Sequence, residues 1–426
     1  MVKVAIIDSG IQDKFKQYIK KSYIVNKNQI TRSDEKYVAN MHGSVCAYIL
    51  KKYCNDCEII NLNILNENEQ SDIFSLKNAL QWCIENDIKV VSLSVGSSYF
   101  EDKEELKNII SEMQSNHIYI VAAANNHNSI TFPASLDGVI GVKCDLSSTL
   151  KEGEIFVDKR DLRNIEITVG TLKSIADLEK FELGYNNSYV VPYIAAEVCN
   201  AINENKNVWD YIYSDSILNI ESDFYINSFP IMYRPEPIIV DIGGDDYDDD
   251  IFEYVIKLFR TSGYFAIGIT DRNICKQYCY AKSDITWLEE EKKWEYIIKS
   301  FNPDIVFTRN IDDDSNNNRD CIVNISREPS EYNYTKKKET YEEYNDNGMQ
   351  YIGDFGNYGI SVSGEMDSIE PENFYFEGDI DEKTKKEIMN ALKNGMITQQ
   401  TQCCNEVIEI RREEINSIVD IIENIF

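Results

Sequence analysis

The stretch Val4-Ala5-Ile6-Ile7-Asp8-Ser9-Gly10, close to the start of the chain, decides the predicted fold. A short, uninterrupted apolar run that ends at turn residues is typical of a strand buried on both faces of a parallel sheet. Asp8 then lies at the carboxyl end of this strand, the edge at which open α/β sheets form their sites. The stretch therefore predicts a buried first strand with a carboxylate at the functional edge.

The N-terminal half of the chain continues with alternating strand-like and helix-like patterns. Apolar runs predict strands at residues 2–8, 58–65, 88–95 and 118–124. Apolar side chains at helical spacing predict helices at residues 43–53, 72–86 and 104–113. Strands and helices that alternate in this way predict a doubly wound parallel sheet, and so an α/β fold.

A polar stretch with several prolines separates this half from the rest of the chain. We therefore predict a first domain over residues 1–205, a linker over 206–235 and a second, Rossmann-like α/β domain over 236–426. In the second domain, strands are expected at residues 237–242, 264–270, 304–308 and 321–325. Helices are expected at residues 250–261, within 287–301, near 381–393 and near 405–425.

The charge of the chain excludes some classes of partner. Its 426 residues include 73 acidic and 43 basic side chains, which gives a formal net charge of −30. Lys and Arg side chains drive binding to nucleic acid and to anionic membrane surfaces. We therefore expect neither a nucleic-acid partner nor a membrane partner.

The composition also bears on the cellular compartment. The apolar run after Met1 is too short for a secretory signal, and no stretch reaches the length of a membrane span. The 11 cysteines are odd in number and scattered, unlike a disulfide framework. We expect a cytoplasmic protein with reduced thiols and with no N-terminal prodomain.

One cysteine pair, Cys54-Asn55-Asp56-Cys57, has the spacing of a redox or zinc motif. No second pair lies nearby at the spacing that a zinc finger needs. We therefore interpret this pair as a helix-end turn that happens to contain two cysteines.

Three further motifs follow the Asp8 stretch in the chain. They are His42-Gly43-Ser44, Val121-Ala122-Ala123-Ala124-Asn125-Asn126 and Asn187-Ser188-Tyr189-Val190-Val191-Pro192. A serine hydroxyl attacks a peptide carbonyl only if a base removes its proton, a carboxylate orients the base, and donors stabilise the oxyanion. The four motifs supply one residue type for each of these roles, in a chain with only three histidines.

In this order, the motifs resemble those of the subtilisin-like serine protease (subtilase) family, over residues of about 2–202. The resemblance implies a subtilisin-like protease domain in which Asp8 is the carboxylate, His42 the base and Ser188 the nucleophile. It also implies that Asn126 donates to the oxyanion. The string Ser92-Leu93-Ser94-Val95-Gly96 resembles the family's substrate-lining strand, so the expected substrate-binding residues are Ser94, Val95, Gly96, Ala123 and Ala124.

The departures of the chain from the family's motifs include three asparagines. Asn186-Asn187 stands where the family has Gly-Thr before the serine, and Asn125 replaces the glycine before the oxyanion asparagine. Neither departure removes a catalytic atom. We expect them to affect substrate fit and rate more than mechanism.

The resemblance implies a serine endopeptidase that needs no cofactor and no catalytic metal, with structural calcium left open. The layout is similar to subtilases that mature ribosomally made, cysteine-rich peptides in clostridia-like bacteria. That similarity implies processing of one cytosolic precursor peptide, whose leader would bind the C-terminal half.

Two other hypotheses stay open. One is a catalytically inactive subtilase that serves as a peptide-binding scaffold in a maturation complex. The other is that the second domain is an enzyme in its own right, in which the acidic run from Asp245 to Asp250 holds a divalent cation at the end of a strand. We favour a solvated acidic turn with a helix cap for that run.

Overall fold

The computed structural model describes residues 1–33, 41–66, 68, 70–99, 101–126, 130–173, 186–217, 220, 224, 237–243, 249–270, 279–309, 321–326, 350–355, 358–362, 374–377, 406–411, 415–416 and 418–423. Contacts between Cα atoms divide the chain into two compact units. The first unit contains Met1–Pro235 together with Thr286–Asn302, and the second contains Glu236–Ile285 together with Pro303–Phe426.

The first unit is built on a ten-stranded sheet in the order β10-β8-β9-β7-β6-β5-β1-β4-β2-β3. Its parallel strands run from β9 to β2 across the centre of the sheet. They are β1 (Val2–Asp8), β2 (Lys21–Val25), β4 (Cys57–Asn63), β5 (Val90–Leu93), β6 (Tyr119–Ala123), β7 (Ile140–Asp145) and β9 (Ile167–Gly170). The outer strands are β3 (Ile30–Arg32), β8 (Ile155–Val157) and β10 (Ser216–Ile217). The prediction of a doubly wound parallel sheet is confirmed.

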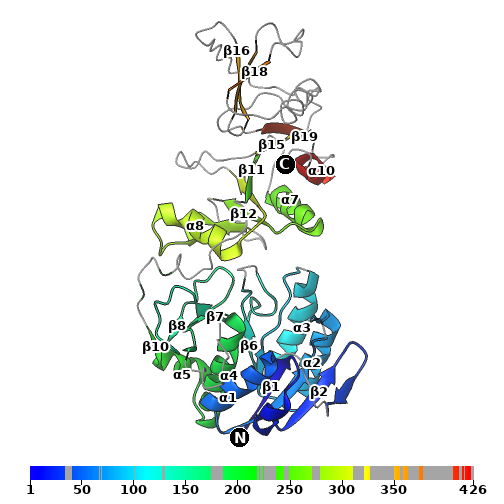
Figure 1. Ribbon diagram of the computed structural model, residues 1–426, viewed down its shortest axis with the longest axis vertical. Helices are drawn as coiled ribbons and strands as arrows, with labels where there is room; N and C mark the ends of the chain where they lie inside the picture. The colour runs from blue at the N-terminus through cyan, green and yellow to red at the C-terminus, as the bar shows by residue number, and fades with distance from the viewer. Residues whose placement is uncertain are drawn as a thin grey trace. The chain divides into compact units, whose positions relative to one another are not determined.

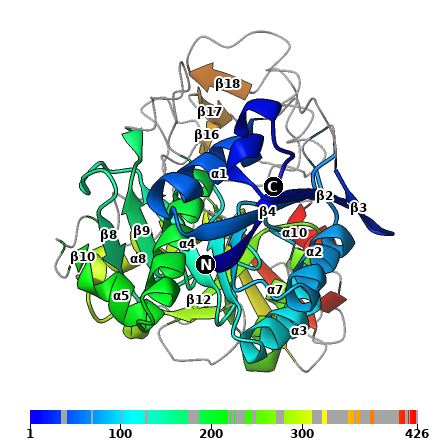
Figure 2. The same cartoon turned by 90° about the horizontal axis from the view of Figure 1, so that it is seen from below.

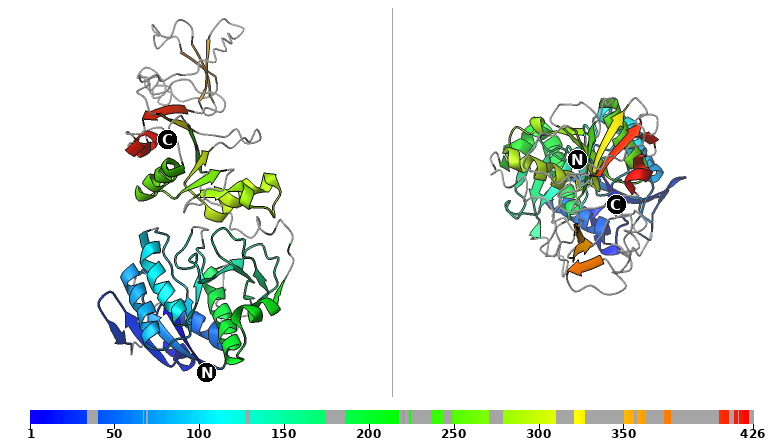
Figure 3. Two further views of the ribbon diagram at one scale, coloured as in Figure 1. Left: turned by 180° about the vertical axis from the view of Figure 1, so that it is seen from behind. Right: turned by 90° about the horizontal axis from the view of Figure 1, so that it is seen from above.

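Helices cover both faces of this sheet, as Figures 1 and 2 show. On one face, α1 (His42–Tyr53), α4 (Asn187–Asn203) and α5 (Val208–Ser214) bury apolar side chains in a common core. On the other face, α2 (Ile73–Glu85) and α3 (Glu101–Ser115) build a second core. In Figure 3 these two helices, blue and cyan, lie side by side. A short helix, η1 (Asp13–Tyr18), precedes β2.

Local sequence explains where these elements begin. The Asp72 side chain accepts a hydrogen bond from the Ser75 N–H at 2.9 Å, which satisfies one of the free donors at the start of α2. At the start of α4, Asn186 caps the helix in the same way through the Ser188 N–H. Cys54 is the C-cap of α1, as the interpretation of its motif as a helix-end turn predicts.

The second unit has a six-stranded sheet in the order β13-β12-β14-β11-β15-β19, with every pair parallel. The strands are β11 (Ile238–Gly243), β12 (Ala266–Thr270), β13 (Cys279–Ala281), β14 (Ile305–Arg309), β15 (Cys321–Ser326) and β19 (Glu406–Arg411). The helices α7 (Asp249–Thr261) and α10 (Ile418–Glu423) pack on its core, and η3 (Lys282–Asp284) follows β13. This parallel sheet confirms the α/β class predicted for the C-terminal half, and its strand order places β14 between β11 and β12.

A separate antiparallel sheet in the second unit contains β16 (Gln350–Phe355), β17 (Tyr358–Val362) and β18 (Phe374–Glu377). Helix α8 (Glu290–Phe301) lies between β13 and β14 in the chain, yet its contacts place it in the first unit. The segment 206–235 contains α5 and β10 among its described residues.

The helix expected near 405–425 is wrong for its first part, because Glu406–Arg411 form strand β19. Val407 and Ile408 in this run are β-branched, and the run pairs in register with β15, so tertiary pairing outweighs helical spacing. Only Ile418–Glu423 are helical. The helix expected near 381–393 and residues 245–248 of the acidic run lie outside the described residues.

No helix among the described residues is both long enough and apolar enough to cross a bilayer. Six of the cysteines that the structure describes, all in the first unit, are free thiols: Cys46, Cys54, Cys57, Cys83, Cys144 and Cys199.

Candidate active site

The site is built around Asp8, the last residue of β1, whose side chain is completely buried. Both carboxylate oxygens lie 2.8 Å from the His42 Nδ1 atom. The Ser9 N–H donates to Asp8 Oδ1 at 2.6 Å. These contacts fix the carboxylate at the carboxyl end of the sheet, where the parallel topology predicts a site.

His42 is the first residue of α1, and a glycine brings this helix close to the end of β1. The Gly43 N–H donates to Ser9 Oγ at 3.0 Å. A Cβ atom at Gly43 would lie 2.6 Å from the Ser9 carbonyl oxygen, closer than real Cβ contacts. Glycine at this position therefore allows the imidazole to reach Asp8.

Ser188 is the second residue of α4, and its Oγ lies 2.6 Å from His42 Nε2. The first turn of a helix presents free N–H groups and a positive dipole end, which favours negative charge beside this serine. Asp8, His42 and Ser188 thus form one hydrogen-bonded series across three separate elements.

Pro192 has a specific effect on the backbone of Ser188. Proline has no N–H, so the Ser188 carbonyl, four residues earlier, loses its usual helical partner. The Ser94 hydroxyl donates to this carbonyl at 3.4 Å, and the Cys46 thiol donates to it at 4.0 Å. Ser94 therefore supports the backbone of Ser188.

Asn126 follows β6 and is held in one orientation. Its Oδ1 accepts from the Asn187 N–H at 2.9 Å, so its Nδ2 faces the N-terminus of α4. That Nδ2 donates to the Asn186 side-chain oxygen at 3.1 Å. The oxygen of Asn186 also accepts from the Ser188 N–H at 3.0 Å and from the Ser188 hydroxyl at 2.6 Å.

Asn187 is a positioning residue whose contacts sequence reasoning missed. Its buried Oδ1 accepts from the Cys144 N–H at 2.8 Å. Its Nδ2 donates to the carbonyls of Ala124 and Asn125, both at 3.1 Å. One side chain therefore joins α4 to β7 and to the turn that carries Asn126. The motif Asn187-Ser188 was the available signal, but a cap asparagine and a long-range contact look alike in sequence.

The second missed residue is Tyr189, directly after Ser188. Its ring stacks on the His42 imidazole, with 4.9 Å between ring centroids and 30° between planes. An imidazole held on one side by this ring and on another by Asp8 has little freedom to leave Ser188.

The electrostatics of the site depend on burial and on the Asp8–His42 pair. Burial raises the pKa of Asp8, but the charge and hydrogen bond of His42 and the Ser9 N–H more than offset it and lower this pKa. Burial acts to lower the pKa of His42, yet the neighbouring Cys46 sulfur and the Asp8 carboxylate raise it above its ordinary value. Burial also raises the pKa of the Cys46 thiol, so the lasting negative charge beside the imidazole is that of Asp8.

Among the described residues, Asp8, His42 and Cys46 are the group with the spacing of metal ligands, with ligand atoms within 4.8 Å of one another. The first two are already hydrogen-bonded to each other, and Cys46 is a neutral thiol whose sulfur lies 3.7 Å from Asp8 Oδ2. A metal ion would have to break the contacts that orient His42. The arrangement therefore suits proton transfer better than metal binding.

The other expected substrate-binding residues lie around the same edge of the sheet. Val95 packs on the core beneath α2 and α3, and Gly96 lies against Thr131 and Phe132, where a Cβ would clash. Ala123 ends β6, and Ala124 follows it and is held by Asn187. Of the five, the hydrogen bonds connect Ser94 and Ala124 directly to the residues around Ser188.

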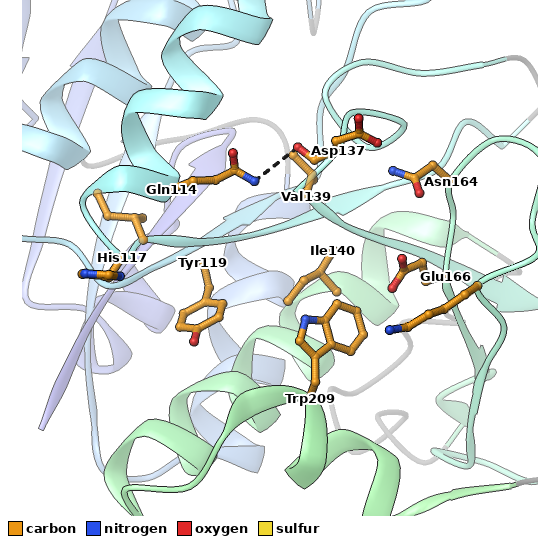
Figure 4. A pocket seen from close by; sticks show the side chains of 12 residues that line it. Gln114, His117, Tyr119, Asp137, Val139, Ile140, Asn164, Glu166 and Trp209 are labelled. Atoms are coloured by element: carbon orange, nitrogen blue, oxygen red, sulfur yellow. Dashed lines mark hydrogen bonds between the residues drawn. The ribbon is translucent and has the colours of Figure 1, made fainter. Parts of the chain in front are cut away.

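A cavity of about 440 Å³ lies elsewhere in the first unit (Figure 4). Tyr119 and Ile140, the first residues of β6 and β7, line it, so it opens at the amino ends of these strands. Gln114 crosses its rim and donates to the Asp137 carbonyl at 3.4 Å. The cavity is therefore at the opposite edge of the sheet from Asp8 and Ser188.

The chain is similar to known proteins over part of its length. The family model described as the subtilase family matches residues 1–210. The chain is 24% identical over 149 residues to the minor extracellular protease Epr of Bacillus subtilis (strain 168). That match covers 33% of this chain and 23% of Epr, so the chain spans less than a quarter of its curated relative.

Two solved structures are also similar. A lanthipeptide protease is 13% identical, with a TM-score of 0.37, and the match covers 50% of this chain and 78% of that one. The epidermin leader peptide processing serine protease EpiP from Staphylococcus aureus is 14% identical, with a TM-score of 0.37. That match covers 50% of this chain and 68% of that one.

Proposed function

Residues 1–210 of this chain belong to the subtilase family of serine proteases, and from that premise we propose that the chain is an active serine endopeptidase. Ser188 is the nucleophile, His42 the general base and Asp8 the carboxylate that orients it. Asn126 Nδ2 and the Ser188 N–H hold the oxyanion.

The reaction proceeds by acyl transfer. As Ser188 Oγ bonds to the substrate carbonyl carbon, its proton passes to His42 Nε2, and Asp8 stabilises the imidazolium that forms. The carbonyl oxygen becomes an oxyanion and takes hydrogen bonds from Asn126 and from the start of α4. His42 then protonates the leaving amine, and water hydrolyses the acyl-enzyme by the reverse proton path.

One observation carries this proposal: the continuous contact from Asp8 through His42 to Ser188, at 2.8 Å and 2.6 Å. An activated serine reacts with a fluorophosphonate, whereas an ordinary surface serine does not. We expect a single adduct by intact mass on the wild type and none on Ser188→Ala. Absence of an adduct on the folded wild type would contradict an active protease.

We further propose that the substrate is a dedicated precursor peptide in the cytosol, with its leader bound by the C-terminal unit. Six cysteines of the first unit, Cys46, Cys54, Cys57, Cys83, Cys144 and Cys199, are free thiols, as a reducing compartment would keep them. A peptide library derived from a whole proteome tests the narrow specificity: we expect cleavage at few sequences. Efficient cleavage at many unrelated sequences would contradict dedicated processing.

The alternative function is an inactive subtilase domain that binds peptides as a scaffold in a maturation complex. The observation that favours it is the Asn186 side chain, which already holds the donors that a substrate carbonyl needs. A folded wild type that binds peptides but never reacts with the fluorophosphonate would support the scaffold.

A further inference from the structure

We propose that Asn186 is a built-in competitor of the substrate, because its side-chain oxygen occupies the oxyanion position and must leave before a scissile carbonyl can bind. The inference rests on the proposed function. It assigns a rate-controlling role to a residue outside the Asp8–His42–Ser188 series.

The Asn186 side-chain oxygen has the contacts that an oxyanion would have. An oxyanion is stabilised by donors 2.7–3.1 Å away. The Asn186 Oδ1 atom lies 3.1 Å from Asn126 Nδ2 and 3.0 Å from the Ser188 backbone nitrogen, the two donors assigned to the oxyanion. It is also 2.6 Å from Ser188 Oγ. An amide oxygen thus sits where the substrate's own amide oxygen would be as the serine attacks.

The hydrogen of the Ser188 hydroxyl is directed to Asn186 and not to His42. Ser188 Oγ has one hydrogen, and it points to Asn186 Oδ1. The 2.6 Å contact with His42 Nε2 then requires that Nε2 carry a hydrogen and donate to Oγ. With Nδ1 donating to Asp8, the ring is an imidazolium, the form that the carboxylate stabilises. In this resting arrangement the base is already protonated and the nucleophile's hydrogen is turned away from it.

The contact between the Asn186 side chain and the Ser188 N–H also stabilises the start of α4. Asn186 is the N-cap of α4, with extended backbone dihedrals (φ −143°, ψ 122°), and its side chain satisfies the Ser188 N–H. A substrate must therefore replace both a cap and an oxyanion ligand. A peptide that makes further contacts with the protein can offset this loss better than a small ester can, so Asn186 raises selectivity at a cost in rate.

Two substitutions at one position test the inference in opposite directions. Asn186→Gly removes the competing oxygen while keeping a tolerated cap residue. We expect fluorophosphonate labelling to become faster, on the order of tenfold, because the net strength of one or two hydrogen bonds no longer opposes it. In labelling, Ser188 Oγ bonds to phosphorus, fluoride leaves, and the proton goes to His42.

Asn186→Asp keeps the shape and the cap but places a carboxylate in the same position. Charge-assisted hydrogen bonds are about twice as strong as neutral ones, so we expect labelling to slow by on the order of tenfold or more. The thermal midpoint of this variant should not fall, because a carboxylate is favoured at a helix N-terminus.

Asn207→Gly is the matched control. Asn207 caps α5 through the N–H groups of Trp209 and Asp210, so this variant loses a cap asparagine without touching the site. Its labelling rate should equal that of the wild type.

The outcomes separate the two proposals. If the wild type labels at Ser188 but Asn186→Gly labels no faster, the competitor role is wrong and the proposed protease stands. Faster labelling of Asn186→Asp than of the wild type would also overturn the inference. If neither the wild type nor Asn186→Gly reacts although both unfold at similar temperatures, both proposals fail together.

Discussion

Asparagine side chains organise the surroundings of Ser188, because one amide can accept and donate hydrogen bonds at once. Asn126 accepts from the backbone of α4 and thereby aims its amide nitrogen, while Asn187 holds the strand and turn behind it. Each of these contacts joins residues far apart in the chain. At the residue scale, the geometry of the site is therefore set by amide orientation as much as by the charged pair.

Replacing Asn126 with alanine should slow turnover rather than weaken binding. Its Nδ2 serves the transition state, and loss of one oxyanion donor usually costs about 10²–10³-fold in kcat. Steady-state kinetics on a peptide substrate should show this fall with KM nearly unchanged. Asn125→Ala, which removes an amide that faces Ser98 instead, is the control. A large rise in KM at constant kcat would refute the assignment.

The rate of acylation should rise with pH as His42 loses its proton. Because the pKa of His42 is raised, the inflection should lie above the ordinary histidine value of about 6.5. The pH dependence of the fluorophosphonate rate constant measures it. Asp8→Asn removes the charge that raises this pKa, so its inflection should move to lower pH, with a much lower rate. An inflection below that of free histidine in the wild type would contradict this account.

At the scale of elements, buried charges tie β7 to the loop that follows β8. Lys143 on β7 lies 2.8 Å from Asp161, and the Arg163 guanidinium lies 3.1 Å from the same carboxylate. Asp161 and Arg163 are almost fully buried. A buried carboxylate with two cations is costly to leave unpaired, so each member depends on the others.

Asp161→Asn should destabilise the first unit by about 3–5 kcal/mol, because it removes the buried negative charge that Lys143 and Arg163 share. Burial acts to raise the pKa of Asp161, but Arg163 and Lys143 lower it strongly overall. The contribution of this carboxylate to stability is therefore fully present at pH values above its unfolded-state pKa of about 3.9. It is lost as the pH falls toward the lower pKa of Asp161 in the folded state.

Urea unfolding at neutral pH and at about pH 3 measures both effects. The wild type should lose stability on acidification, and Asp161→Asn should lose less. Asp87→Asn, at an exposed pair with Lys89, is the control and should change stability little. Equal acid sensitivity of the wild type and Asp161→Asn would show that this carboxylate is not responsible.

The elements differ in how far sequence could predict them. The helix predicted at residues 72–86 and the buried strand ending at Asp8 follow from local pattern, and the structure has them as α2 and β1. Strand β19 depends on a partner strand far away in the chain, which no local pattern reveals. The four candidate residues Asp8, His42, Asn126 and Ser188 were recognisable from their motifs. The position of the Asn186 oxygen depends on the Asn126 amide, the Ser188 N–H and the Ser188 hydroxyl, which only the fold brings together.

At the scale of the molecule, the first unit is discontinuous in sequence. The segment Thr286–Asn302 returns to it after β11 to β13 have been completed in the second unit. Tyr296 of α8, 2% exposed, lines a small cavity with Lys143, Asp161 and Phe156. Its burial shows that α8 contributes to the core of the first unit and is not a surface attachment.

Tyr296→Ala in the full chain should therefore destabilise the first unit by about 3–5 kcal/mol, the usual cost of removing a buried aromatic ring. Tyr296→Phe keeps the ring and should cost much less. Chemical unfolding of this unit can be monitored by the loss of fluorophosphonate labelling at Ser188. If Tyr296→Ala leaves that transition unchanged, α8 does not stabilise the unit.

Because α8 comes late in the chain, the first unit cannot complete its packing until residues 286–302 have been synthesised. A nascent chain carries Asp8, His42, Asn126 and Ser188 well before the ribosome has added residues 286–302. At about 5–20 residues per second, several seconds of translation separate the last strand of the first unit's sheet from the helix that completes its packing. The first unit therefore completes its packing only after β11 to β13 of the second unit have been synthesised, which delays the full stability of the candidate site until translation is well advanced.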